Sequence, residues 1–274
     1  MAVEPPDKFT LRNDVYYYEA NDKESFRAGR IEVEADLTFL VNLTTLLYKP
    51  EFQVAGAQYA FGALIPVAKN EINSTLNSNL MAADATYSAT SEASGLGDIV
   101  LVPLVLYWNE DNLHTTFSQY IVAPTGDYDE SESINAGLNY WSFDSNIALS
   151  YLNPVSGWEI SGNLGYIYNT ENSDTDYQSG QEIHVDIAIN RYLTESLALG
   201  IHGFHQKQIT GDSGDGAVLG DFKAEVYGVG PALLWSTQIA DKPVSVIAKW
   251  LHDFDADRRL EGDHFIVSFA IGLN

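Results

Sequence analysis

The sequence predicts an all-β protein: one closed antiparallel transmembrane β-barrel of about twelve strands, with short periplasmic turns and long extracellular loops. Apolar and polar residues alternate over segments of about ten residues, as in strands with one face toward lipid. Long and short connections alternate along the chain, and aromatic residues lie at the strand ends. We assign residues 1–274 to a single domain, in which 1–8 form a periplasmic or lumenal N-terminal segment.

Five segments show the alternation most clearly. They are 31–42, 141–151, 158–169, 183–190 and 264–273. A helix would place Glu32 and Asp36 beside Val33 and Phe39 and so mix the two faces. Less regular segments complete the set of twelve: 9–19, 51–69, 98–108, 112–123, 196–209, 222–236 and 243–254. Parts of two of these, 59–67 and 99–108, are apolar on both faces, which indicates contact with a plug, with the N-terminal segment or with a dry lumen.

The connections between these segments fall into two classes. The short ones lie near 43–50, 108–112, 152–157, 192–196 and 236–243. The mostly longer ones lie near 20–28, 70–97, 124–140, 169–181, 210–221 and 255–262 and are rich in Gly, Ser, Asn and Asp. A water-soluble β-sandwich also alternates apolar and polar residues. The asymmetry of the connections and the aromatic strand ends favour a barrel in the outer membrane of a Gram-negative bacterium.

The composition excludes several classes of protein. The chain has 14 basic and 38 acidic residues and a net charge of −24, so it has no basic surface for nucleic acid. It contains no cysteine, which excludes disulfides and thiolate metal sites. No run of eighteen apolar residues is present, so no transmembrane helix is predicted.

A series of short motifs resembles a known family of outer-membrane channels, the "meta-pathway of phenol degradation-like" transporters. The motifs occur in the family's order: Leu11-Arg12-Asn13-Asp14, Tyr59-Ala60-Phe61-Gly62 with Pro66, Gly95-Leu96-Gly97-Asp98 with Pro103, Ala123-Pro124-Thr125-Gly126-Asp127-Tyr128, Asn139-Tyr140-Trp141, Asn169-Thr170-Glu171-Asn172, Asp176-Tyr177-Gln178-Ser179-Gly180, Asp212-Ser213-Gly214, Gly230-Pro231, and Phe254-Asp255 with Arg258 and Glu261-Gly262-Asp263. The resemblance implies a twelve-stranded barrel that takes up small hydrophobic or aromatic molecules. The chain departs from the usual terminal aromatic residue, because it ends Ile271-Gly272-Leu273-Asn274.

Charged residues predicted to face the lumen are the candidate pore lining. They are Glu32, Glu34, Asp36, Asp144, His184, Asp186, Lys223, Glu225 and Lys249. A row of inward carboxylates would favour cations or orient a solute. The alternative is that inward bases such as Arg12, Arg30, Lys223 or Lys249 neutralise these acids, because like charges on one face repel each other.

Three prolines lie inside predicted strands, where each removes one ladder donor. Pro66, Pro103 and Pro231 therefore predict β-bulges or breaks in pairing, and they are the positions where a side opening of the wall is to be sought.

Three functions are compatible with this pattern. The first is a passive channel for small, mainly hydrophobic solutes. The second is a closed barrel with a structural, adhesive or receptor role through its acidic loops. The third is a barrel hydrolase, with a histidine such as His184 or His205 as the residue to test. No nucleophile motif, cofactor motif or metal-binding motif is present, so we expect a protein that is not an enzyme.

The expected partners follow from the barrel. They are outer-membrane lipid, lipopolysaccharide and small solutes, and the barrel is expected to be a monomer. The acidic loops at 127–132, 171–176 and 212–215 offer oxygen ligands for calcium or magnesium, but none has a complete calcium-loop pattern. Solvated loops are the alternative.

Overall fold

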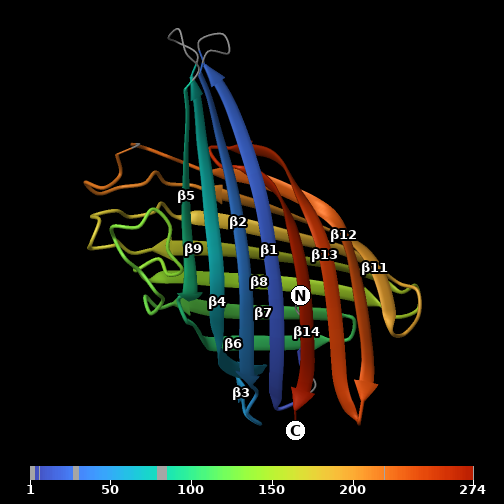
Figure 1. Cartoon of the computed structure of the whole chain (residues 1–274). Helices are drawn as coiled ribbons and strands as arrows, with labels where there is room; N and C mark the ends of the chain where they lie inside the picture. The colour runs from blue at the N-terminus through green and yellow to red at the C-terminus, as the bar shows by residue number, and fades with distance from the viewer. Residues whose placement is uncertain (1–3, 6, 27–30, 79–84, 219, 274) are drawn as a thin grey trace.

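The computed structural model describes residues 4–5, 7–26, 31–78, 85–218 and 220–273. In this part of the chain an antiparallel sheet closes on itself, because β2 pairs with both β1 and β4 at the two ends of the strand order (Figure 1). The strands are β1 (Phe9–Phe26), β2 (Ile31–Tyr48), β3 (Gln53–Val54), β4 (Ala57–Ser78), β5 (Ala85–Leu96), β6 (Val100–Glu110), β7 (Leu113–Val122), β8 (Ser142–Asn153), β9 (Trp158–Asn169), β10 (Glu182–Tyr192), β11 (Leu197–Gln208), β12 (Glu225–Ile239), β13 (Lys242–Asp257) and β14 (Glu261–Leu273).

The fourteen strands make twelve positions around the wall of the described barrel, as predicted. The short β3 only forms a hairpin with β4. β5 and β6 share one side of β4: β5 pairs with 67–78 and β6 with 58–64. β5 and β6 together therefore fill a single position in the wall, with a break between Leu96 and Val100.

The outside of the barrel is apolar and its inside is largely polar. Outward Ile160 and Ile201 are 55% and 63% exposed, whereas inward Ser150 and Asn190 are 0% and 2% exposed. A surface of large exposed apolar side chains matches a lipid environment and is the reverse of a water-soluble sheet. Among the described residues, no helix is long and apolar enough to cross a membrane.

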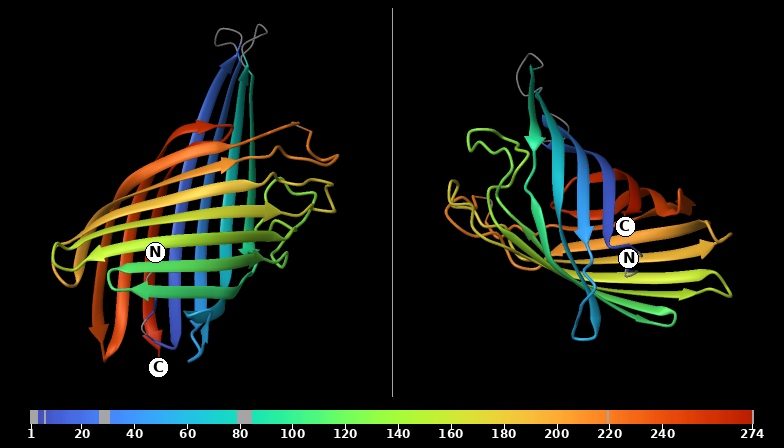
Figure 2. Two further views of the ribbon diagram at one scale, coloured as in Figure 1. Left: turned by 180° about the vertical axis from the view of Figure 1, so that it is seen from behind. Right: turned by 90° about the horizontal axis from the view of Figure 1, so that it is seen from below.

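Four strands continue beyond the rest of the barrel at the end with the long connections. β14 begins at Glu261, opposite Asn21 of β1, but β1 and β2 pair as far as Phe26 and Ile31. β4 and β5 extend beside them, so β1, β2, β4 and β5 form a protruding sheet, which we call the extracellular sheet (Figures 1 and 2).

The prediction of long loops at 20–28 and 70–97 is therefore wrong for most of their length; 27–30 and 79–84 lie outside the described residues. The segment 70–97 lacks apolar alternation because its Asn, Ser and Thr side chains form a strand surface that does not face lipid.

Candidate functional site in the lumen

One part of the lumen wall is polar, and we call it the polar arc: the inward faces of β8 to β14 and β1. Its side chains hydrogen bond to one another across neighbouring strands. Ser150 and Ser161 are 2.7 Å apart, Ser161 donates to Glu159 at 2.9 Å, and Asn190 donates to Glu159 at 3.3 Å. Because all four are buried, these bonds compensate polar groups that would otherwise be unsatisfied.

The most buried acid of the polar arc is Asp253, which is 0% exposed. It lies within hydrogen-bond distance of His264 Nε2 (2.7 Å) and Tyr18 Oη (3.2 Å), and it accepts from the Gly262 amide (3.2 Å). Tyr16 Oη lies 2.7 Å from the other ring nitrogen of His264. The alternating pattern of 264–273 placed His264 inside, but no motif signalled this cluster.

Beyond β7, which carries buried Thr116 and Ser118 inward, the wall is largely apolar, and we call it the apolar arc: the inward faces of β2, β4 and β6. Val102, Val105 and Tyr107 of β6 pack with Ala60 of β4, and Leu47, Leu64 and Tyr120 pack against this cluster. This region includes the segments that are apolar on both faces in the sequence. The short-turn end of the arc lies close to the N-terminal segment, because Lys49 Nζ and Asn109 Nδ2 each donate to Glu4 at 2.7 Å.

Four predicted pore-lining residues are on inward faces and form a group with Arg12. His184 lies between two acids, with Asp144 Oδ1 at 3.3 Å from Nε2 and Asp186 Oδ2 at 3.4 Å from Nδ1. Lys249 of β13 interacts electrostatically with Asp186, Arg12 and Asp14. The side chains of Asp186 and Arg12 are 41% and 48% exposed, so this level of the lumen is accessible to solvent.

The prediction that Glu32, Glu34 and Asp36 face the lumen is wrong. They share a face of β2 with Leu40 and Leu46, which are 42% and 51% exposed on the outside of the barrel. The opposite face carries Phe39, which stacks on buried Tyr18 at 6.2 Å between ring centroids. Alternation separates two faces without saying which is inside, and in β2 the apolar face is the inner one.

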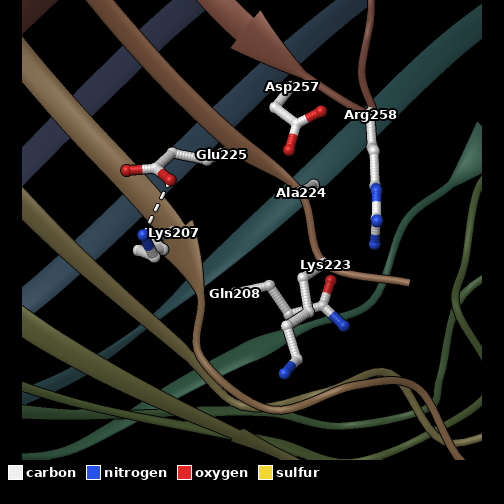
Figure 3. Close-up of a pocket in the computed structure, with 7 residues that line it drawn as sticks. All are labelled: Lys207, Gln208, Lys223, Ala224, Glu225, Asp257 and Arg258. Atoms are coloured by element: carbon white, nitrogen blue, oxygen red, sulfur yellow. Dashed lines mark hydrogen bonds and ion pairs between the residues drawn. The ribbon is translucent and has the colours of Figure 1, made fainter. Parts of the chain in front are cut away.

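Lys223 and Glu225 are also not in the lumen group. They line a pocket at the extracellular ends of β11, β12 and β13, beside Lys207, Asp257 and Arg258 (Figure 3). Glu225 accepts from Lys207 Nζ at 2.7 Å and lies 2.8 Å from His205 Nε2. Glu225 pairs with Lys207 on the outward face of the wall, and Lys223 lies before β12, 3.4 Å from Asp221. The prediction of a lumen-lining role for Glu225 and Lys223 is therefore wrong.

The three prolines lie at irregular points of the ladders. Pro103 lies within the register shift of β6 against β7, between Leu101 and Leu104. Pro66 lies where β4 changes partner from β5 to β6. Pro231 falls in a gap of the pairing between β12 and β13, from Val229 to Ala232.

The break between β5 and β6 is stabilised by residues of two of the motifs that resemble the family. Asp98 is buried and accepts backbone N–H groups of Thr125 (3.0 Å), Gly126 (2.8 Å) and Leu138 (2.6 Å). A Cβ on Gly126 would lie 2.7 Å from the Gly97 carbonyl carbon, so the two glycines permit a close approach of backbones. The connection 123–141 is thereby fixed against the break between β5 and β6.

The acidic loops are tied to one another by their own carboxylates. Asp212 accepts from Tyr177 Oη (2.6 Å), from the Gly180 amide (3.0 Å) and from Gln208 Nε2 (2.6 Å). Burial and the Asp212 carboxylate together raise the pKa of Tyr177 above its usual range. In the described part of the chain, no three His, Cys, Asp or Glu side chains are grouped to hold a metal ion.

The fold and its lumen define an outer-membrane channel type of β-barrel. A family model described as "Putative MetA-pathway of phenol degradation" matches residues 19–269, and the chain belongs to this family. An outer membrane channel from Pseudomonas putida F1 has a similar structure, with a TM-score of 0.67, 18% identity, and coverage of 98% of this chain and 99% of that one. A Pseudomonas aeruginosa FadL homologue matches with a TM-score of 0.44 and 8% identity, over 97% and 89% of the two chains. No curated protein matches the chain.

Proposed function

We propose that this protein is a passive channel in the outer membrane of a Gram-negative bacterium, and that it admits small, mainly hydrophobic or aromatic molecules. The observation that carries the proposal is the apolar arc, which runs beside a polar and partly solvated arc in one lumen. The family description, which refers to phenol degradation, supports the same class of solute. The apolar outer belt is the surface that outer-membrane lipid would cover.

The energetics suit passage rather than storage. A small aromatic that covers about 100 Å² of apolar surface gains about 2.5 kcal/mol. This is enough to concentrate the solute at the wall and weak enough for rapid release, which conduction through a channel requires. The neighbouring polar arc keeps water in the lumen, so the solute exchanges between wall and water.

Uptake by cells tests the proposal. We expect cells that lack this protein to take up labelled naphthalene slowly and to recover fast uptake when the protein is restored. Leu64→Asn in the apolar arc should reduce that recovery, whereas Ser118→Ala on the polar inward face of β7 should not. Equal uptake with and without folded protein in the outer membrane would contradict the proposal.

A further inference from the structure

The two faces of the extracellular sheet differ in chemistry. On its inner face, Val33 of β2, Leu76 of β4 and Tyr87 of β5 are paired directly opposite one another across three strands. A second row on the same face pairs Leu37 with Ile72. The inner face therefore presents two apolar rows, one above the other.

The outer face of the same sheet is polar. Asn73 accepts from Thr90 at 2.6 Å, and Asn77 accepts from Thr86 at 2.7 Å, across β4 and β5. Glu34 lies on this face of β2, opposite Thr75. A polar outer face shows that the sheet has passed the lipid belt, so the apolar rows of the inner face lie outside the hydrocarbon region.

The upper apolar row is open to solvent. Val33 and Leu76 are each 39% exposed and Tyr87 is 69% exposed. Leaving large apolar side chains together in water costs free energy, so a contiguous exposed group of this kind marks a surface that binds something. The strand structure does not itself require apolar residues here, because the outer face of the same three strands consists mainly of polar side chains.

The exposed row continues into the barrel. Every second residue of β2 from Ile31 to Leu43 is apolar and lies on the inward face, with Leu37 and Phe39 between the sheet and the lumen. Leu43 lies level with Pro66 of β4, next to the apolar arc. A solute on the sheet would thus reach the lumen along one apolar stripe.

We infer that the inner face of the extracellular sheet is the capture site of the channel, where an uncharged hydrophobic solute first leaves the external water. The inference rests on the proposed function and names its entry step. Charge excludes organic anions from this surface, because the chain carries 38 acidic and 14 basic residues and its extracellular loops are acidic. Three exposed large side chains fit a small molecule, whereas a stable protein interface needs about 800 Å² on each partner.

A pair of substitutions tests capture against a matched control on the same strands. Val33→Asn with Leu76→Asn makes the exposed row polar, and Glu34→Asn with Thr75→Asn changes the outer face at the same level. The readout is the initial rate of naphthalene uptake as a function of its external concentration. We expect the inner pair to raise the half-saturating concentration about tenfold with an unchanged maximal rate, since the lumen is intact. The control pair should behave as the native protein.

Two further measurements keep the test decisive. The milder pair Val33→Ala with Leu76→Ala should shift the half-saturating concentration in the same direction by less, which a folding defect would not do. Purified native protein should bind the neutral fluorophore N-phenylnaphthylamine more strongly than the inner pair does, whether or not the barrel transports naphthalene. Because fluorophore binding does not depend on transport, it tests the capture site separately from the proposed channel function.

Three results would overturn the inference. One is an unchanged half-saturating concentration and fluorophore binding in the inner pair. Another is a lower maximal rate alone, which would place the defect in the lumen. The third is a native dimer that the inner pair converts to monomer, because the face would then be a surface for self-association.

Discussion

The polar arc and the apolar arc form one wall with the same antiparallel pairing, yet they are built by opposite rules. In the polar arc, buried Ser150 and Asn190 face the lumen and apolar side chains face lipid. In the apolar arc, Val102 and Leu64 face inward although their strands also carry apolar side chains outward. The outer face is therefore apolar in both arcs, as lipid requires, whereas the inner face differs between them.

The largest expected effect is the loss of the Asp253 carboxylate from the polar arc. Asp253→Ala removes the partner of His264 Nε2 in a buried site and leaves Tyr18 Oη with the Leu260 carbonyl as its acceptor. We expect the free energy of unfolding to fall by about 3–5 kcal/mol. Denaturant unfolding in lipid vesicles, followed by the gel shift between folded and unfolded barrel, measures it. Asp215→Ala in an exposed loop is the control, and equal stability of the two variants would refute a structural role for the cluster.

The break between β5 and β6 should be nearly as sensitive. Asp98→Ala leaves three backbone N–H groups of the 123–141 connection without an acceptor. We expect a loss of about 1–3 kcal/mol and faster proteolytic cleavage within this connection. If the cleavage rate does not change, Asp98 does not hold the connection against the break between β5 and β6.

A hydroxyl group introduced into the wall should lower the free energy of unfolding more in the apolar arc than in the polar arc. Val102→Thr puts a hydroxyl into the packed cluster of the apolar arc, and we expect it to cost about 1–3 kcal/mol. Ala148→Ser adds a hydroxyl beside the polar side chains of β8 and should change stability by less than about 0.5 kcal/mol. Equal costs, measured by the same unfolding assay, would remove the distinction between the arcs.

The smallest effect concerns ion selectivity. Lys249→Met removes an inward positive charge that interacts with Asp186, so the channel should prefer cations more strongly. The reversal potential of single channels in a KCl gradient should shift by a few millivolts in the cation-selective direction. Lys242→Met at the first residue of β13 should leave the reversal potential unchanged. A shift toward anions in Lys249→Met would show that Lys249 does not face the ion path.

The sequence predicted the barrel well and its interior only in part. Lipid imposes a regular apolar period, which identified β8, β9, β10 and β14 and placed Asp144, His184 and Asp186 inside. Lys249 was also placed inside, although its segment 243–254 is less regular. β5 has no such apolar period, so it looked like a loop. The alternation in β2 does not say which of its two faces points into the lumen. Only the pairing with Tyr18 of β1 shows that Phe39 rather than Glu34 points inward. The contacts of Asp98 and Asp253 join residues far apart in the sequence, and no local pattern indicates them.

The most direct test of the account is to locate a solute in the lumen. The chain has no cysteine, so single cysteines label without background. Leu43→Cys reports on the inward apolar face of β2, and Asn163→Cys reports on the polar arc in β9. We predict that naphthalene slows the reaction of a small thiol reagent at position 43 and leaves the reaction at position 163 unchanged. Protection at position 163 alone, or at neither position, would contradict a channel whose apolar arc carries hydrophobic solutes.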